Sequence, residues 1–339
     1  MKADANKEKI DFVLIWVDGN DPEWQKVKDK YLPNKSQDAG RSRYRDWDNL
    51  KYWFRAVEKY APWVNKIHFI TCGQCPKWLN TNNPKIHMVN HKDYIPEEYL
   101  PTFSANPIEL NFHRIEELSE QFVYFNDDFF LTDYVNPEDF FSKGMPKDIY
   151  MEYPVGCSGN NEVFSHLLVN DYNLIGRHFN RREIHKRLKN KILSPSYGKY
   201  WFYNEIMYHL PFQNFFGVLT PHFAQPYLKS SYEKVWKEEP EVLHETCLRK
   251  FRHKDDVNSY VFRLWNLMEG NFIPYNRFKY GKAFFIHEEN EQLYEAIRKQ
   301  KYKYICINDD CSEEEYEVIK KKVIDAFEEI LPQKSEFEL

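Results

Sequence analysis

The sequence lacks the features that mark membrane-spanning, secreted and nucleic-acid-binding proteins. The apolar run Phe12–Val17 is only six residues long, whereas crossing a bilayer takes roughly 18 consecutive apolar residues. Residues 1–10 contain no apolar segment of the kind found in a secretory signal. Lys and Arg number 47 against 52 Asp and Glu, for a net charge of -5, so the basic footprint of general nucleic-acid binding is missing. We therefore expect a cytoplasmic protein with no nucleic-acid partner.

Cysteine is also scarce. Six cysteines in 339 residues are too few for a disulfide scaffold. Cys72 and Cys75 form a C-x-x-C pair, but a zinc site of this type needs a second pair. Cys306 and Cys311 have four residues between them and no ligand-like partner in the sequence. The expectation is a set of reduced thiols without a functional role.

Aromatic residues, by contrast, are abundant at 17%, within an apolar content of 42%. That content supports a sizeable core and excludes a mostly disordered chain. The 9 Trp, 24 Tyr and 26 Phe are too many to be functional as a group, so most are expected in the core, although some could stack on sugar rings. There is no internal repeat, low-complexity block or Gly/Ser linker. We therefore treat 1–339 as a single domain.

The first 130 residues alternate between strand-like and helix-like patterns. The runs typical of buried strands are Phe12–Val17, Ile67–Thr71, Ile86–Val89 and Phe122–Phe125. Between them, 48–60 carries a helical apolar stripe, and a second helix is predicted from Asn106 through Leu118. A capping box at Ser312 begins a C-terminal helix. This alternation predicts an α/β fold with a mostly parallel sheet.

Acidic residues follow two of the predicted strands. Asp18 and Asp21 come after the first, and Asp127 and Asp128 after the fourth. Ligands of such sheets bind beyond the carboxyl ends of the strands, where carboxylates can hold a divalent cation or accept a proton. This arrangement fits a nucleotide-diphosphate substrate carried with Mg²⁺ or Mn²⁺. The alternative for either pair is a solvated turn.

The middle of the chain, from about 150 to 280, has a less regular pattern. Residues 177–191 carry seven Lys or Arg against one Glu, which would attract a polyanionic acceptor or an anionic membrane surface. A solvated basic helix face is the simpler interpretation. On local sequence alone, His222 is a structural histidine and Arg252 belongs to a solvated charged turn.

Four blocks of the sequence nevertheless resemble the Stealth family of sugar-1-phosphate transferases. This family includes bacterial capsular polysaccharide phosphotransferases and the catalytic part of the animal lysosomal-enzyme N-acetylglucosamine-1-phosphotransferase. The blocks include IDFVLIWVDGNDPEW, FVYFNDDFFL, PHFAQPY with FRHKDD, and ICINDDCSEEEYEV. They lie, in the family's order, within Ile10–Trp24, Arg43–Leu131, Pro221–Asn258 and Ile305–Leu339.

The resemblance implies transfer of a hexose 1-phosphate, in particular an N-acetylhexosamine 1-phosphate, from a UDP-sugar to a glycan hydroxyl, with release of UMP. It implies a nucleotide-sugar-binding core similar to GT-A transferases, with irregular helical additions. The expected divisions are a nucleotide-binding half at 1–135, a variable acceptor-side insertion at 136–220, and a second catalytic half with the C-terminal helix at 221–339. The compact length is similar to that of the bacterial capsule enzymes.

The resemblance also implies roles for individual residues. Asp128 matches the proposed catalytic base, and His222 and Arg252 match the residues around the transferred phosphate. Asp127 and Asp309 are the expected ligands of Mg²⁺ or Mn²⁺. The expected donor-binding residues are Trp16, Asp18, Gly19, Asp21, Glu109, His113, Asn126 and Asn308.

Two other functions remain open at this stage. A conventional GT-A glycosyltransferase would use the same donor but release UDP, and a non-catalytic carbohydrate-binding protein would bind sugar without turnover. The expected partners are a UDP-sugar donor and an oligosaccharide or lipid-linked glycan acceptor. A lipid-linked acceptor would place peripheral contact at the inner face of the cell membrane.

Overall fold

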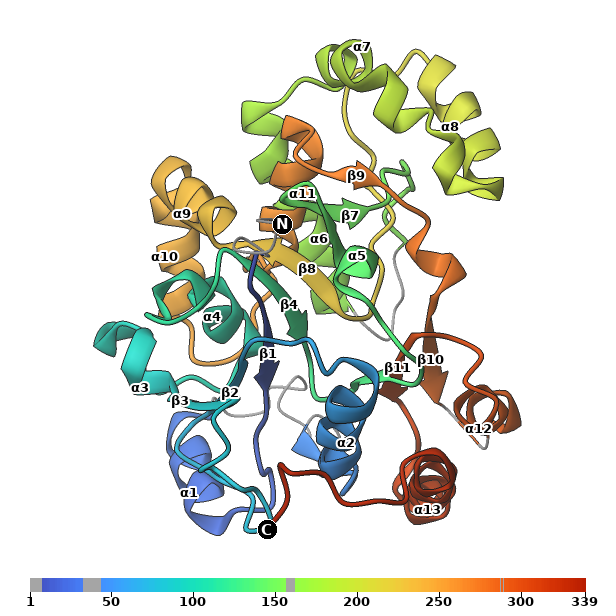
Figure 1. The fold of residues 1–339 in the computed structure, drawn as a ribbon. Coiled ribbons are helices and arrows are strands. Elements are labelled where there is room, and N and C mark those ends of the chain that lie inside the picture. The colour runs from blue at the N-terminus through green and yellow to red at the C-terminus, as the bar shows by residue number, and fades with distance from the viewer. Residues whose placement is uncertain (1–7, 33–43, 157–161, 287, 289) are drawn as a thin grey trace, which may run out of the picture.

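The computed structural model describes residues 8–32, 44–156, 162–286, 288 and 290–339, and Arg43, the start of the second block, lies outside them. A five-stranded sheet has the order β3-β2-β1-β4-β8 (Figure 1). Its strands are β1 (Ile10–Ile15), β2 (Ile67–Thr71), β3 (Ile86–Asn90), β4 (Gln121–Phe125) and β8 (Gln225–Leu228). All neighbours pair in parallel except β4 and β8. The expected α/β class and mostly parallel sheet are confirmed.

Both faces of this sheet are covered, which explains the uninterrupted apolar run of β1. Phe12 and Leu14 belong to one core, which also contains the buried face of α2 (Leu50–Tyr60). Val13 and Ile15 point the other way into a second core. A strand buried on both faces needs apolar residues at every position rather than at alternate ones. Most of the aromatic residues that the sequence holds in excess fill these two cores.

A second sheet has the order β10-β11-β5, with β10 (Gly281–Ile286), β11 (Tyr304–Asp309) and β5 (Phe129–Leu131). β10 and β11 are parallel and β5 is antiparallel to β11. The chain passes from β4 to β5 through residues 126–128 alone, so this short loop joins the two sheets. The C-terminal helix α13 (Glu313–Ile330) begins as predicted, with Ser312 accepting from the backbone N–H of Glu315.

A small third sheet and several helices complete the molecule. The third sheet comprises β6 (Phe141–Ser142), β7 (Met145–Asp148) and β9 (Ile273–Pro274). The helices before the middle segment are α1 (Pro22–Tyr31), α3 (His91–Tyr94), α4 (Ala105–Leu110) and α5 (Pro137–Phe140). Those that follow are α6 (Glu162–His178), α7 (Arg181–Ile192), α8 (Lys199–His209), α9 (Lys229–Glu238), α10 (Pro240–Leu248), α11 (Tyr260–Glu269) and α12 (Glu291–Arg298). Helices α7 and α8 lie at one end of the molecule, at the top of Figure 1. No helix in the described part of the chain is long and apolar enough to span a bilayer.

The helix predicted from Asn106 to Leu118 is wrong in both bounds. It begins at Ala105 under a Ser104 cap and ends at Leu110. The side-chain amide of Asn111 donates to the carbonyl oxygen of Pro107 at 2.8 Å, so it uses the acceptor that the next helical turn would need. A short 3₁₀ turn, Phe112–Arg114, follows. Leu118 is buried without being helical.

Candidate active site

The loop between β4 and β5 presents Asp128 at the junction of the two sheets. The backbone carbonyl of Asp128 accepts from the N–H of Ile307 in β11 at 2.9 Å. One carboxylate oxygen accepts from the side-chain amide of Asn126 at 2.9 Å. These bonds fix both the backbone and the carboxylate of Asp128, while the expected donor-binding role of Asn126 stays a prediction.

Three chain segments bring further polar groups to this carboxylate. Nε2 of His222 lies 3.9 Å from Oδ2 of Asp128, and the thiol of Cys306 lies 3.2 Å from the same oxygen. His222 is itself held by Tyr260, whose hydroxyl is 3.2 Å from Nδ1. The side-chain nitrogen of Asn308 is 3.4 Å from Nε2. The structure therefore joins Asp128, His222 and Asn308, which lie far apart in the sequence.

The charges of this group are poorly compensated. Burial and the neighbouring Asp128 carboxylate raise the pKa of Asp127, although its side chain is open to solvent on one side. Burial raises the pKa of Asp128 more than His222 and the hydrogen bonds from Cys306 and Asn126 lower it. Burial also lowers the pKa of His222, so the imidazole is neutral at pH 7. The pair of carboxylates therefore has an unusually high affinity for a proton or a cation.

Glu109 and Arg252 belong to the same electrostatic group. Glu109, on α4, accepts from the hydroxyl of Tyr124 at 3.0 Å and from that of Ser259. Burial raises the pKa of Glu109, and the positive charge of Arg252 opposes that rise. The same charge helps to lower the pKa of His222. Half-buried Arg252 therefore acts on the pKa of both residues, while its expected place around the transferred phosphate stays a prediction.

The end of β1 is organised by Gln74. Its side-chain amide donates to the carbonyl of Asp18 at 3.0 Å and to the carboxylate of Asp21 at 2.9 Å. Asp21 also caps α1 by accepting from the backbone of Glu23. The contacts of Asp21 are therefore those of a helix cap, while its expected donor-binding role stays a prediction.

Two neighbours of Asp18 have steric roles. A Cβ atom on Gly19 would collide with the backbone of Tyr44, so only glycine permits this close approach. Trp16 stacks on Phe69, with ring centroids 5.8 Å apart. Both residues shape the end of β1, and donor binding by either of them stays a prediction.

Asp46 interacts electrostatically with acidic residues at both strand ends, and no pattern in the sequence predicts it. Burial raises the pKa of Asp46, and the charges of Asp48 and Asp18 add to the rise. Asp46 in turn helps to raise the pKa of Asp127. Asp46 does not directly follow a strand that the sequence predicts, so the position rule that identified the other acids did not apply to it.

Asp309 makes a dense set of contacts. Its carboxylate lies 3.2 Å from Nε of Arg45 and accepts from the indole of Trp47 at 3.2 Å. The thiol of Cys311 lies 3.1 Å from the other oxygen. These contacts orient Arg45, and metal binding by Asp309 stays a prediction.

His113 stands apart from the carboxylates. Its ring packs between those of Tyr232 and Trp236, with centroids 6.1 and 5.8 Å away. Burial lowers its pKa to about 3. In the described residues its contacts join it to α9 rather than to Asp128, so the structure does not bring it together with the other predicted residues.

The five described cysteines are all free, and Cys157 lies outside the described residues. Two of the five contact predicted site acids, which the sequence did not indicate. Cys306 contacts Asp128 and Cys311 contacts Asp309. Burial and the Asp128 charge raise the pKa of Cys306 far above its ordinary value, so it stays a thiol. The pairing of β11 with β5 brings Cys306 to the site, and spacing along the chain carries no signal of this.

The candidate site offers a mixed set of oxygen, nitrogen and sulfur ligands and, separately, carboxylate oxygens. Single ligand atoms of Asp128, His222 and Cys306 lie within 4.8 Å of one another, a set of oxygen, nitrogen and sulfur that suits zinc. Mg²⁺ and Mn²⁺ prefer oxygen ligands. The carboxylates that interact around Asp46, namely Asp18 and Asp127, offer only oxygens.

Comparison with known proteins identifies the family. Models of three conserved regions of the Stealth proteins match: region 1 over residues 8–36, region 2 over 43–148 and region 4 over 295–339. A capsular polysaccharide phosphotransferase of Streptococcus pneumoniae is 40% identical over 336 residues, 98% of this chain and 99% of the relative. The chain belongs to the Stealth family. At the site of this Stealth protein, residues of regions 2 and 4 contact one another at Asp128, and Asp18 of region 1 acts on the pKa of Asp46.

Two further relatives show how far the similarity extends. A receptor polysaccharide phosphotransferase of Streptococcus oralis is 39% identical over 341 residues, 98% of this chain and 99% of the relative. An exopolysaccharide phosphotransferase of Lactiplantibacillus plantarum is 39% identical over 332 residues, 97% and 96% of the two chains. The relatives thus match this Stealth chain over nearly its whole length, including the residues between the three matched regions.

Proposed function

We propose that this Stealth protein transfers a hexose 1-phosphate from a UDP-sugar to a glycan hydroxyl in the synthesis of a capsular or other cell-surface polysaccharide. It is an enzyme of the polysaccharide phosphotransferase class, as its full-length relatives are named. One observation supports the finer assignment: Asp128 stands beside neutral His222, with Arg252 acting on the same group. Asp128 can accept a proton at the same place where His222 and Arg252 can hold a phosphate.

Asp128 is the proposed general base. Its carboxylate is held by Asn126 and its raised pKa gives it affinity for a proton. As the acceptor oxygen bonds to the β-phosphorus, its proton passes to Asp128. The bond from that phosphorus to the bridging oxygen breaks, and the oxygen leaves with the α-phosphate as UMP. The product is a phosphodiester between the sugar and the glycan.

His222 and Arg252 are the proposed phosphate ligands. A guanidinium binds phosphate through two parallel N–H donors. If the hydroxyl of Tyr260 donates to Nδ1 of His222, the proton of the neutral ring is on Nε2, the atom that faces Asp128. That N–H would then donate to an oxygen of the transferred phosphate while Asp128 holds the acceptor hydroxyl.

The carboxylate of Asp127 would supply an oxygen ligand to Mg²⁺ or Mn²⁺, although in the described residues Asp18 and Asp46 do not form a three-ligand cluster with it. The pKa of Asp127 and that of Asp46 are raised by burial and by like charges, and a divalent cation would relieve this repulsion. When bound, it would neutralise charge on the diphosphate. We expect EDTA to abolish turnover and added Mg²⁺ or Mn²⁺ to restore it. Full activity after exhaustive chelation would remove the metal from the proposal.

A screen of UDP-sugars, beginning with UDP-N-acetylhexosamines, tests the function with an oligosaccharide acceptor and then a lipid-linked glycan. Release of UMP together with a phosphodiester-linked product is the expected result. Release of UDP would instead identify a conventional GT-A glycosyltransferase. Saturable binding of sugar with neither nucleotide released would identify a binding protein.

A further inference from the structure

Helix α7 carries a stripe of unpaired cations. Arg182, Lys186 and Lys189 are exposed; Arg182 and Lys186 are one turn apart, Lys189 follows a kink at Leu188, and all three line one hollow. None of the three forms an ion pair with any described residue. The other cations of α7 are engaged: Arg181, for example, is buried against Glu152 at 2.6 Å.

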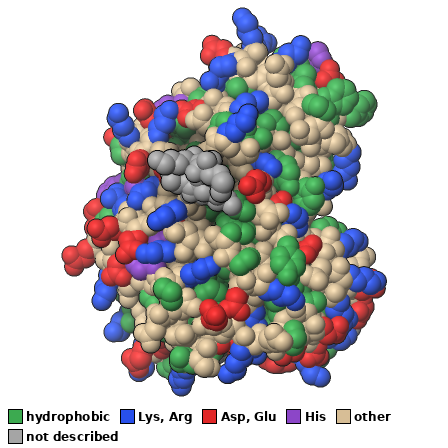
Figure 2. Space-filling view, viewed as in Figure 1, with side chains coloured by type: hydrophobic (Ala, Val, Ile, Leu, Met, Phe, Trp, Pro, Cys, Tyr) green, Lys and Arg blue, Asp and Glu red, His purple; other side chains and the backbone are tan. Residues whose placement is uncertain are grey.

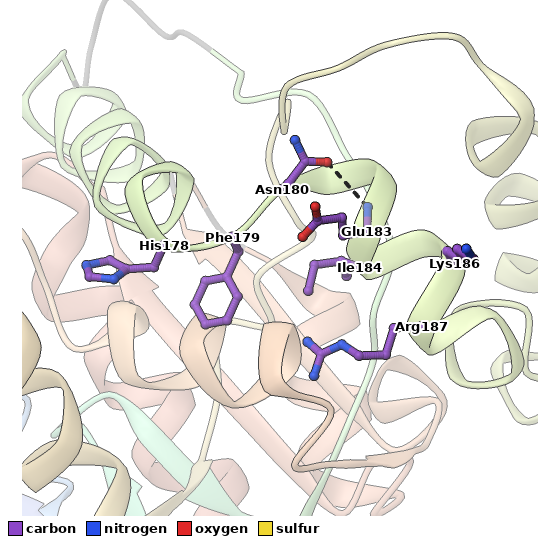
Figure 3. A pocket seen from close by; sticks show the side chains of 7 residues that line it. All are labelled: His178, Phe179, Asn180, Glu183, Ile184, Lys186 and Arg187. Carbon is purple, nitrogen blue, oxygen red and sulfur yellow. Dashed lines mark hydrogen bonds between the residues drawn. The ribbon is translucent and has the colours of Figure 1, made fainter.

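Arg187 shows the contrast between the two sides of α7. Its guanidinium donates to the carbonyl oxygens of Met268 and Glu269 on α11. In Figure 3 it points towards the neighbouring helix, whereas Lys186 points away from it. The acid of this helix, Glu183, lines the hollow on the Arg187 side. Lys186 also lines that hollow, so the stripe is defined by the exposure of its three side chains and by a second hollow that all three of them line.

Helix α8, which packs against α7 through Tyr208, exposes large apolar side chains. Phe202 is 66% exposed and Ile206 50%, and they are one turn apart on the same face. Phe212, just after the helix, is 44% exposed. A helix that is apolar on its outer as well as its inner face differs from an ordinary surface helix. In Figure 2, basic and hydrophobic side chains gather at the upper end of the molecule, over α7 and α8.

Packing between α7 and α8 places the three cations near Phe212. Arg182, Lys186 and Lys189 line one hollow together with Tyr208, Leu210 and Phe212. The rings of His185 and Tyr208 stack with centroids 4.9 Å apart and hold α8 against α7. The exposed acid of α8, Glu205, is bonded to His209 at 3.2 Å. We call Arg182, Lys186, Lys189, Phe202, Ile206 and Phe212 the α7–α8 surface.

We propose that the α7–α8 surface docks this protein on an anionic phospholipid bilayer. Three unpaired cations would meet headgroup phosphates, and Phe202, Ile206 and Phe212 would enter the boundary between headgroups and acyl chains. A soluble polyanion would use the cations but leave the apolar residues in water. A second copy of the chain would bring like charges together. The net charge of -5 means that only a local basic surface can direct the protein to such a membrane.

The test uses the full chain and co-sedimentation with vesicles. We expect binding to phosphatidylcholine vesicles containing phosphatidylglycerol, weak binding to phosphatidylcholine alone, and release by high salt. Replacing Arg182, Lys186 and Lys189 by Gln should weaken binding roughly a hundred-fold. The double variant Phe202→Ser, Ile206→Ser should weaken it at least about ten-fold. All these residues lie outside the catalytic group, so turnover with a soluble acceptor should be unchanged.

Matched controls are Lys237→Gln on α9 and Val318→Ser on α13, both at exposed positions; neither should affect binding. Equal binding of all variants, or equal binding to neutral and anionic vesicles, would overturn the proposal. Binding to dextran sulfate but not to vesicles would overturn it in favour of a soluble polyanion. A dimer that the Phe202 and Ile206 changes dissociate, without vesicle binding, would assign the surface to a second copy. Vesicle binding needs no turnover, so failure of the proposed reaction would leave this test intact.

Discussion

Two groups of acids in this molecule have opposite environments: one is buried near α7, and the other, at the β4–β5 junction, is partly open to solvent. Near α7, Glu152 lies 2.6 Å from Arg181 and 2.9 Å from His185, and Asp148 lies 2.6 Å from Arg263. At the β4–β5 junction, the nearest described basic group to Asp128 is the imidazole of His222, at 3.9 Å. One group is fully paired and the other carries unpaired negative charge.

The pKa values of Glu152 and Asp128 shift in opposite directions, as their ionic surroundings predict. Burial alone would raise the pKa of Glu152, but hydrogen bonds from His185 and Arg181 hold it below its ordinary value. Burial raises the pKa of Asp128, and the groups around it do not offset the rise. An acid whose charge is compensated within the protein stabilises the fold. An acid whose charge is left uncompensated is available to a proton, a metal or a substrate.

The largest expected effect is that of Asp128→Asn on turnover. The amide keeps the shape of the side chain but cannot take the acceptor proton, so kcat should fall roughly a hundred- to ten-thousand-fold. Loss of the charge also relieves repulsion with Asp127, so the fold should be retained. UMP release, donor affinity and the melting temperature should be measured on the same sample.

Those three measurements separate the roles open to Asp128. A main role as metal ligand would lower donor affinity, and extra metal would partly restore it. A structural role would lower the melting temperature, with activity following the folded fraction. A folded variant with near-normal turnover would refute the catalytic assignment.

Glu152→Gln should show the reverse pattern, with a loss of stability rather than of chemistry. A neutral amide leaves the buried charge of Arg181 uncompensated, which typically costs about 3–5 kcal/mol of unfolding free energy. Urea denaturation should show a lower midpoint, and activity per folded molecule should be unchanged. An unaltered midpoint would mean that the buried pair is not a net source of stability.

Arg252→Lys tests the proposed phosphate contact with charge conserved. An ammonium cannot reproduce the planar pair of donors, so kcat should fall roughly ten- to a thousand-fold, as when one preorganised transition-state donor is lost. The variant should melt like the wild type because Arg252 is only half buried. Wild-type kcat would exclude Arg252 from the site.

The sequence predicts features that depend on local patterns better than features that depend on contacts between distant segments. Local patterns located the central strands and α13, and the ends of β1 and β4 located Asp18 and Asp128, because parallel strands place their carboxyl ends at one edge. The resemblance added His222 and Arg252, whose local patterns favoured structural roles. Cys306 was missed because its role arises from strand pairing between β11 and β5, which no local pattern encodes.

The smallest expected effect concerns pH, where the two groups of acids should differ in sign. The lowered pKa of Glu152 means that its stabilisation is present above the ordinary pKa of Glu, about 4.3, and is lost as pH falls through the lowered value. The destabilisation caused by Glu152→Gln should therefore shrink as pH is lowered towards 3. The raised pKa of Asp128 has the opposite consequence: between the ordinary pKa of Asp, about 3.9, and the raised value, the folded state loses stability as pH rises.

The variant Asp128→Asn has no carboxylate at this position and so does not lose stability there as pH rises. Its stability relative to the wild type should therefore increase with pH. Denaturation of both variants and the wild type from pH 3 to 8, with EDTA present so that no metal compensates the carboxylates, measures both trends. Opposite slopes for the two variants are the expected result. Parallel slopes would show that the charges of the site acids are as well compensated as those near α7. The hypothesis that the proposed active site carries uncompensated negative charge would then be wrong.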